Sequence, residues 1–330
     1  MARPLCQPPS EPAATPATTE NTVRLAYRLL LGREVESPEA LRAHLDLPTL
    51  AALRRAIMAS PEFQSKVLHG RFCGHSKWVA TEVMDRFTMW VDLADQYVSR
   101  GCLNNSWEPS ESGYLSAHVA CGDVVLDIGA NVGWFSLLAA KCVGRKGAVH
   151  AFEPRPDTSA MLKRTIADND LRSLVSVWTL ALSNQWGRVE LNWERDTDNP
   201  GHSFIGSLPA ERRRECESTV VTAAVLDELL PELAPDFIKI DIEGAEARAL
   251  AGAQAAIGRK HPPIMSELYP QQLQEVSGVS PRAYIAQLAA LGYTCYLLED
   301  GRPTRRLEDF PPDAPCELVS VVFERDGGIS

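Results

Sequence analysis

The segment VVLDIGANVGWFSLLAA, residues 124–140, decides the fold class. Its first part is an apolar run of strand length, and its last part has the composition of a buried helix. Between them lies a short loop of small residues, GANVG at 129–133. Gly129 lets the backbone turn sharply, and Gly133 lets a helix begin close to a ligand. A strand, a glycine loop and a helix in this order are typical of the first unit of an open α/β sheet.

Apolar strands and helical stretches continue to alternate after this segment. The strands are apolar on both sides, as strands covered by helices on both faces must be. We therefore predict a doubly wound, mainly parallel, seven-stranded α/β sheet, finished by an antiparallel pair at its C-terminal edge. The predicted strands lie at 124–129, 148–154, 176–182, 237–244, 263–268, 293–299 and 316–324.

The N-terminal part of the chain differs in composition from this core. Three short apolar-periodic stretches follow one another, the first ended by Gly32 and the second opened by the capping residue Ser37. They predict a small helical module, for which packing or partner docking is the expected role. The predicted parts are a disordered tail at 1–20, the helical module at 21–65, a lid segment at 66–120 and the core at 121–330.

The composition excludes several classes of protein. The chain has 330 residues, 45% of them hydrophobic, and a formal net charge of -10. This charge disfavours a nucleic-acid partner, which needs clustered Lys and Arg. No apolar run reaches the roughly 18 residues of a membrane span, and no secretory signal is visible. A cytoplasmic protein is expected, and a homo-oligomer is possible. The eight cysteines include no CxxC pair, so reduced thiols are expected.

The residues around the glycine loop indicate a nucleoside ligand. The loop is not the dinucleotide fingerprint, because Asn131 stands inside it and the glycine spacing is shorter. The next strand ends at Glu153, where a carboxylate can bind both hydroxyls of a ribose. Asp127, at the end of the first strand, suits a ligand with positive charge near its reactive end. S-adenosylmethionine combines these features and is the predicted cofactor.

Four blocks carry a resemblance to a known family: VVLDIGANVGWFSLLAA, AVHAFEPRP, FIKIDIEGAEARALAGA and PIMSEL. Together they resemble the FkbM-type family of S-adenosylmethionine-dependent methyltransferases over about residues 85–325. The resemblance implies the class I methyltransferase fold and methylation of a hydroxyl group, often on a sugar or a polyketide-derived natural product.

The same resemblance assigns cofactor contacts by position. It implies that Gly129, Asn131 and Gly133 surround the methionine and ribose portion, and that Glu153 binds the ribose hydroxyls. It further implies that the Ala181-Leu182 segment passes the adenine ring. Glu108, in the segment SWEPSES, is implied to face the cofactor or the substrate.

The strand FIKIDIEG, residues 237–244, holds the candidate catalytic residues. Its alternation places Lys239, Asp241 and Glu243 on one side. A buried lysine needs a carboxylate partner, and Glu267 at the tip of the neighbouring strand is our first choice. An alcohol acceptor needs a base, for which Asp241 and Glu243 are the leading candidates and Glu267 the third. A purely structural ion pair is the alternative for Lys239.

Weaker signals stay open beside these candidates. Helix capping is the alternative for Glu243, and capping is the favoured role of Glu246. A site for a divalent cation such as Mg²⁺ at Asp241 and Glu267 is considered but not expected, because two oxygen ligands fall short of an octahedral set. Further candidates are His202 as a base, and Trp107, Tyr114 and Trp134 as acceptor contacts or core residues.

Three other functions compete with this hypothesis. A nicotinamide-dependent oxidoreductase would need a third glycine at Rossmann spacing. A nucleic-acid methyltransferase would need a basic face, and for exocyclic amines a [DN]-P-P-[FYW] tetrad where this chain has DIEG at 241–244. A non-catalytic scaffold would keep the fold without the activity. The small-molecule O-methyltransferase is the function that we predict.

Overall fold

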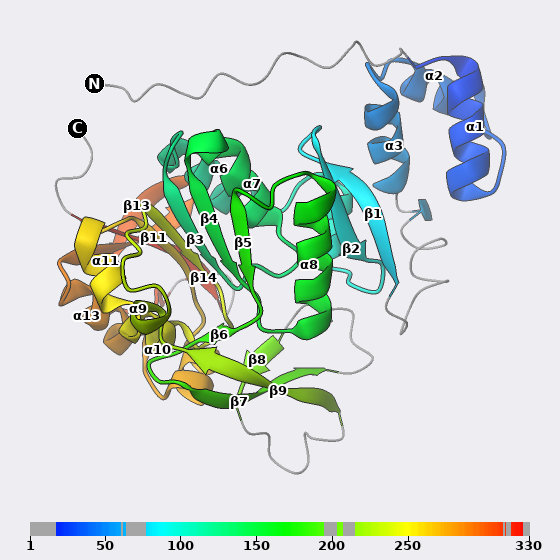
Figure 1. Ribbon diagram of the computed structural model, residues 1–330. Helices are drawn as coiled ribbons and strands as arrows, with labels where there is room; N and C mark the ends of the chain where they lie inside the picture. The colour runs from blue at the N-terminus through cyan, green and yellow to red at the C-terminus, as the bar shows by residue number, and fades with distance from the viewer. Residues whose placement is uncertain are drawn as a thin grey trace. The chain divides into compact units, whose positions relative to one another are not determined.

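The computed structural model describes residues 18–60, 62–63, 77–194, 203–206, 215–312, 314 and 318–325. The chain divides into two compact units (Figure 1). Among the described residues, the smaller one, the N-terminal unit, takes in those from 18 to 107, and the larger one, the sheet unit, takes in those from Glu108 to Arg325. The tail predicted for residues 1–20 lies outside the described residues as far as position 17.

The N-terminal unit begins with the three expected helices, α1 (Glu20–Leu31), α2 (Pro38–Leu45) and α3 (Leu50–Met58). Thr19, Ser37 and Thr49 accept hydrogen bonds from backbone N–H groups at the three helix starts, which satisfies donors that a helix leaves open. Gly32 ends α1 in the left-handed conformation, as predicted. A small core holds the helices together; its buried members are Val23, Tyr27, Leu53 and Ile57.

A β-hairpin and a short helix follow in the same unit. Strands β1 (Trp78–Val83) and β2 (Phe87–Asp92) pair in antiparallel fashion, and α5 (Val98–Leu103) comes after them. The sequence WVDLADQYV at 90–98 suggests a strand over its whole length, but β2 ends at Asp92, where the chain turns into the segment that leads to α5.

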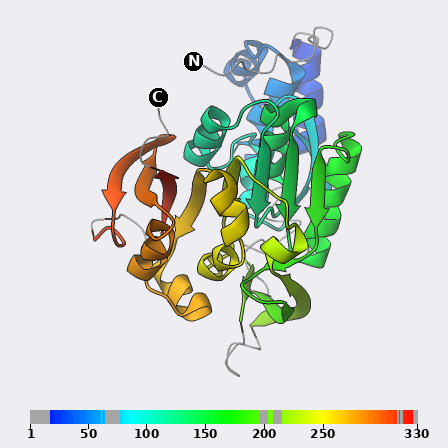
Figure 2. The same ribbon diagram turned by 60° about the vertical axis from the view of Figure 1, so that its left-hand side comes forward.

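The sheet unit is built on eight strands, so the predicted count of seven is wrong by one. Their order is β13-β12-β14-β11-β10-β3-β4-β5, visible from the orange-red edge to the green edge in Figure 2. The five strands from β5 to β11 are parallel, and the last three are joined to them by antiparallel pairing. The strands are β3 (Val124–Ile128), β4 (Ala148–Phe152), β5 (Val175–Trp178), β10 (Phe237–Ile240), β11 (Ile264–Leu268), β12 (Tyr293–Glu299), β13 (Arg302–Leu307) and β14 (Val319–Arg325).

The additional strand explains the difference at the sheet edge. The predicted antiparallel pair of C-terminal strands is present as β12 and β14, but β13 lies outside them as the edge strand. Its sequence, RPTRRL, is too polar to be recognised as a strand from apolar content. Edge strands often carry charged side chains and proline, which discourage pairing with another chain.

Helices cover both faces of this sheet. Ile238 and Ile240 of β10 belong to the core under α10, α11 and α13, whereas Phe237 and Lys239 face the rings of Tyr114 in α6 and Phe135 in α7. This is the predicted alternation of β10. The helices are α6 (Pro109–His118), α7 (Trp134–Val143), α8 (Pro156–Asp168), α9 (Leu226–Leu229), α10 (Glu246–Ala251), α11 (Gln254–Lys260), α12 (Pro270–Gln272) and α13 (Pro281–Ala289). In the part of the chain that the structure describes, none of them is both long and apolar enough to cross a bilayer.

A second, four-stranded sheet was not predicted. Its order is β6-β9-β7-β8, with β6 (Ala181–Leu182), β7 (Gly187–Glu194), β8 (Ser203–Ile205) and β9 (Cys216–Ala224). The single strand predicted at 176–182 is in fact two, since β5 stays in the large sheet and β6 joins the small one. The chain therefore changes sheets at Thr179-Leu180, directly after a strand tip.

The cysteines only partly follow the prediction. Cys102, Cys142, Cys216 and Cys295 are free thiols, and burial raises the pKa values of Cys142 and Cys295, that of Cys295 to about 12. Cys121, however, is disulfide-bonded. The expectation that every thiol is reduced is thus wrong at Cys121, for which the sequence offers no close partner.

Candidate active site

The loop after β3 contacts the loop after β10, and glycine makes this contact possible. Gly129 has a φ of 82°, and a Cβ there would overlap the carbonyl oxygen of Asp241. The N–H groups of Gly129 and Ala130 both donate to the carbonyl oxygen of Phe152 in β4, each at 2.9 Å. The carboxyl ends of three neighbouring strands therefore meet at one place, where ligands bind in open α/β sheets.

An open pocket of about 590 Å³ lies at this edge of the sheet. Apolar side chains of Phe152, Leu180 and Leu182 form part of its wall. Three further members of the second sheet, Leu191 in β7 and Ser203 and Ile205 in β8, also line it and were not among the predicted site residues. Six predicted site residues line the pocket, namely Gly129, Asn131, Glu153, Ala181, Asp241 and Glu243.

Glu153 is fixed at the tip of β4 by backbone donors. Its Oε2 accepts from the N–H of Asn131 at 3.0 Å, and its Oε1 accepts from the N–H of Arg155 at 2.8 Å. Burial raises the pKa of Glu153 to about 7, although both hydrogen bonds favour the charged form. Each carboxylate oxygen keeps a second lone pair for a ligand hydroxyl in the pocket.

Asp127 and Gly133 do not line this pocket. Asp127 is 1% exposed; its Oδ2 accepts a hydrogen bond from Ser136 at 2.6 Å, and its Oδ1 has no partner. Burial raises the pKa of Asp127, while the Lys239 charge and the Ser136 hydrogen bond oppose that rise. Gly133 starts α7 with a φ of 101°, and Leu162 of α8 fills the space where a Cβ would stand. Gly133 thus permits close packing of two helices.

Lys239 has a different partner from the one we predicted. Its Nζ lies 3.2 Å from Oδ2 of Asp241 and donates to the carbonyl oxygen of Gly129 at 3.2 Å. The predicted pairing with Glu267 is wrong, because Asp241, two residues after Lys239 and directly after the end of β10, is the carboxylate at ion-pair distance. Burial alone would lower the pKa of Lys239, but the nearby carboxylates, Asp241 foremost, raise it above its ordinary value. The ammonium therefore stays charged.

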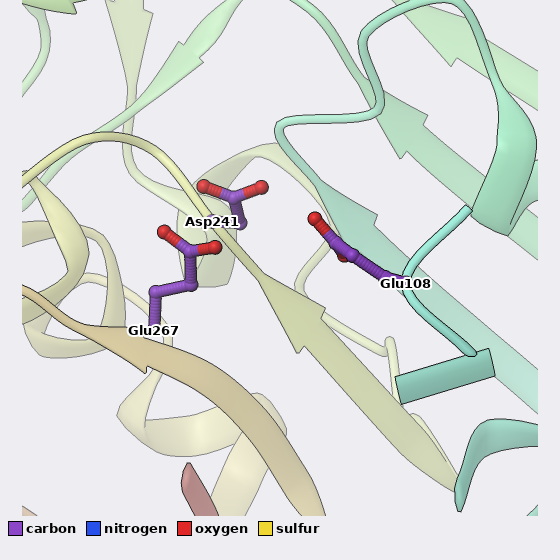
Figure 3. A group of neighbouring side chains, drawn as sticks. All are labelled: Glu108, Asp241 and Glu267. Carbon is purple, nitrogen blue, oxygen red and sulfur yellow. The ribbon is translucent and has the colours of Figure 1, made fainter. Parts of the chain in front are cut away.

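Three carboxyl groups converge beside this ion pair. Glu108, Asp241 and Glu267 each offer an oxygen, and these oxygens lie within 4.8 Å of one another. Figure 3 shows the three side chains pointing toward a common space. Burial and then the Asp241 charge raise the pKa of Glu108 to about 8, and the same two causes raise the pKa of Glu267. We refer to these three residues as the acid cluster.

The loop after β10 places Glu243 at the pocket, and the side chain of Glu246 fixes the conformation of this loop. Glu243 adopts a φ of 54° and lines the pocket. Oε1 of Glu246 accepts from the N–H groups of Ile242 and Gly244, at 2.9 and 3.3 Å. Both donors lie in the loop before α10, and the start of α10 has no side-chain cap hydrogen bond, so the helix-capping role predicted for Glu246 is wrong and its carboxylate fixes the loop instead. Burial raises the pKa of Glu246 to about 7.

Other candidates are placed away from these groups. Trp134 donates its indole N–H to Ser112, and Tyr114 is buried and donates to Glu324, which favours core packing for both. His202 lies outside the described residues. Glu108, which the resemblance places facing the cofactor or the substrate, lies beside Asp241 and Glu267, a meeting that depends on the path of the chain before α6 and has no local sequence signal.

The family model described as "Methyltransferase FkbM domain" matches residues 127–295, more than half of the chain. The chain belongs to the FkbM methyltransferase family. The glycine loop after β3, the acidic strand tips and the strand order are accordingly those of a class I methyltransferase sheet with β13 added. Family membership favours methyl transfer over the oxidoreductase alternative.

Individual relatives are distant. Methyltransferase sdnD of Sordaria araneosa is 28% identical over 169 residues, which cover 42% of this chain and 63% of sdnD. The 31-O-demethyl-FK506 methyltransferase FkbM of Streptomyces tacrolimicus is 27% identical over 238 residues, covering 63% of this chain and 82% of that protein. A solved FkbM methyltransferase from Methylobacillus flagellatus is 17% identical with a TM-score of 0.40, covering 91% of this chain and 58% of that one. The chain thus matches less than two thirds of the length of sdnD and of the solved protein.

Proposed function

We propose that this FkbM-family protein is an S-adenosylmethionine-dependent O-methyltransferase. The observation that carries the proposal is that Asp241 belongs both to the pocket wall and to the acid cluster. A donor held in the pocket and an acceptor hydroxyl held by the cluster would therefore meet at one side chain.

The pocket residues fit the adenosyl donor. Glu153 offers free lone pairs to a ribose, and Phe152, Leu180 and Leu182 offer an apolar wall to an adenine ring. When bound, S-adenosylmethionine supplies a methyl group carried on a sulfonium.

The acid cluster would position and deprotonate the acceptor. Asp241, which lies 3.2 Å from the Lys239 ammonium, accepts a hydrogen bond from an acceptor hydroxyl next to the reacting one and so orients the reacting oxygen. Glu108, whose pKa of about 8 lies near working pH, accepts a hydrogen bond from the reacting hydroxyl and takes its single proton as the oxygen attacks the methyl group. Glu267 shares the released proton with Glu108, because two close carboxylates ionise together only at a cost. A cationic donor beside the cluster lowers these pKa values and activates the base.

The acceptor that we propose is the hydroxyl of a sugar or of a glycosylated natural product. One relative is named for methylating 31-O-demethyl-FK506, which supports oxygen as the acceptor atom. Carboxylates that bind hydroxyl hydrogens suit a polyhydroxylated acceptor better than an apolar one.

Calorimetry with S-adenosylmethionine and S-adenosylhomocysteine, followed by transfer of a labelled methyl group to a panel of glycosylated metabolites, tests this function. We expect both nucleosides to bind, and label to appear as an alkali-stable methyl ether. Asp241→Asn should retain donor binding and lose transfer, with Asp300→Asn, an exposed position away from the pocket, as the matched control. Absence of heat with both nucleosides would refute the proposal.

A further inference from the structure

A second pocket, of about 600 Å³, lies beside the donor pocket. Strand β8 separates the two, because Ser203 and Ile205 face the donor pocket and Phe204 faces the second one. This is the alternation that a β-strand imposes. We call this space the β8 pocket; its lining residues are Glu194, Phe204, Tyr269, Gln271, Gln272, Glu275 and Val276.

The β8 pocket begins next to the acid cluster. Tyr269 follows Glu267 by two residues, a span of at most about 7 Å. Gln272 packs against the loop after β10, since a Cβ on Gly244 would overlap the backbone of Gln272. A ligand in the β8 pocket therefore lies within one loop of Glu243, which lines the donor pocket.

The lining has the chemistry of a site for polyhydroxylated rings. Two half-buried aromatic rings, Phe204 and Tyr269, offer flat apolar surface to the C–H face of a sugar. Gln271 and Gln272 carry amides that both donate and accept hydrogen bonds, and the Gln271 amide is already oriented toward Glu275 by a hydrogen bond of 2.8 Å.

The charge of the lining restricts the ligand further. Among the described residues that line the pocket, Glu194 and Glu275 are acidic and none is basic. Carboxylates accept hydroxyl or ammonium hydrogens and repel a uronate, sulfate or phosphate group.

We propose that the β8 pocket is the acceptor's glycosyl subsite and that it selects a sugar without negative charge. This inference rests on the proposed function, because it assigns the binding place of that reaction's acceptor. Phe204 and Tyr269 position the ring, and Glu275 is a specificity-determining residue that excludes acidic sugars.

The test uses the full chain with S-adenosylhomocysteine bound, and two probes, methyl β-D-glucopyranoside and methyl β-D-glucuronide. Saturation-transfer NMR titrations measure their affinities. We expect the glucoside to bind at least about tenfold more tightly than the glucuronide, the factor that corresponds to about 1.4 kcal/mol. Glu275→Lys should reduce this preference to about threefold or less, because it replaces a repelling charge by an attracting one. Glu232→Lys, an exposed glutamate outside the pocket lining, should leave the preference unchanged.

Calorimetry of S-adenosylmethionine on each variant separates the two hypotheses. If the unmodified chain does not bind S-adenosylmethionine, the proposed function is refuted. Donor binding with no glucoside binding, with equal binding of the two probes, or with a preference that Glu275→Lys does not change would overturn the subsite alone. A glucoside preference that Glu275→Lys reduces, with donor affinity retained, supports it.

Discussion

Replacement of Gly129 by alanine should damage the site through backbone geometry alone. The new Cβ would stand 1.9 Å from the carbonyl oxygen of Asp241, whereas real Cβ atoms keep at least 3.0 Å, so the two loops must separate by more than an ångström. The φ of 82° adds a left-handed penalty of about 1–2 kcal/mol, and forced overpacking adds about 1–3 kcal/mol. We expect Gly129→Ala to lower the free energy of unfolding by about 2–5 kcal/mol in urea titrations.

Two other glycines of the sheet unit separate these causes. Gly122 has a φ of 92° but nothing within 4 Å of the position that a Cβ would take. Gly122→Ala should therefore lower the free energy of unfolding by the left-handed penalty alone. Gly258 lies in α11 with open space and no positive φ, and Gly258→Ala should be neutral or stabilise by up to about 1 kcal/mol. Methyl transfer by Gly129→Ala should fall about 100-fold, because Asp241 moves by about 1 Å. If Gly129→Ala is no less stable than Gly122→Ala, the proposed loop contact is refuted.

The charged groups lead to three further predictions. Glu153→Ala should weaken S-adenosylmethionine binding by roughly 10- to 100-fold in calorimetry, with Glu232→Ala as control. An unchanged dissociation constant would contradict the assignment of Glu153 to the ribose hydroxyls. Lys239→Met should lower the free energy of unfolding by about 2–4 kcal/mol, less than for a fully buried pair because Asp241 is 28% exposed; a loss below about 0.5 kcal/mol in urea titrations would contradict the ion pair's role. Affinity for the donor should rise with pH through about 8, where Glu108 ionises, and affinity for S-adenosylhomocysteine, which lacks the sulfonium charge, should rise less. Glu108→Gln should remove that difference, and a difference that persists would exclude Glu108 as its cause. The raised pKa of Glu108 also affects stability, because between pH 4.5 and about 8 the folded chain keeps the Glu108 proton and the unfolded chain releases it. The contribution of Glu108 to the free energy of unfolding therefore falls as pH rises from 4.5 to about 8. Glu108→Gln should flatten that fall in urea titrations.

The large sheet was predictable because its strands are marked by local composition. Segments such as VVLDI and FIKI are apolar at every position except Asp127 and Lys239, and strands covered by helices on both faces need that pattern. The second sheet also has a signal, since Val189, Leu191 and Trp193 alternate with polar residues at a period of two. That alternation is easily missed because β7 stands between long connecting segments rather than between helices.

The candidate site was predictable only where one strand tip supplies it. Gly129, Asn131 and Glu153 follow directly from their strands and line the pocket. The partner of Lys239 depends on the path of the chain after Ile240, and the approach of Glu108 depends on a contact more than a hundred residues away in sequence. Neither is encoded in spacing, since both arise from tertiary packing.

The edge strand β13 has a consequence for how the protein behaves at high concentration. An exposed edge leaves a row of unpaired N–H and C=O groups, onto which a strand of another molecule can add. In β13 the proline at 303 removes one donor, and Arg302, Arg305 and Arg306 place like charges along the same six residues. If the β13 strand of a second copy paired with this edge, the arginines of the two strands would repel each other. The sequence of β13 therefore disfavours edge-to-edge association of the sheet into fibres at this edge.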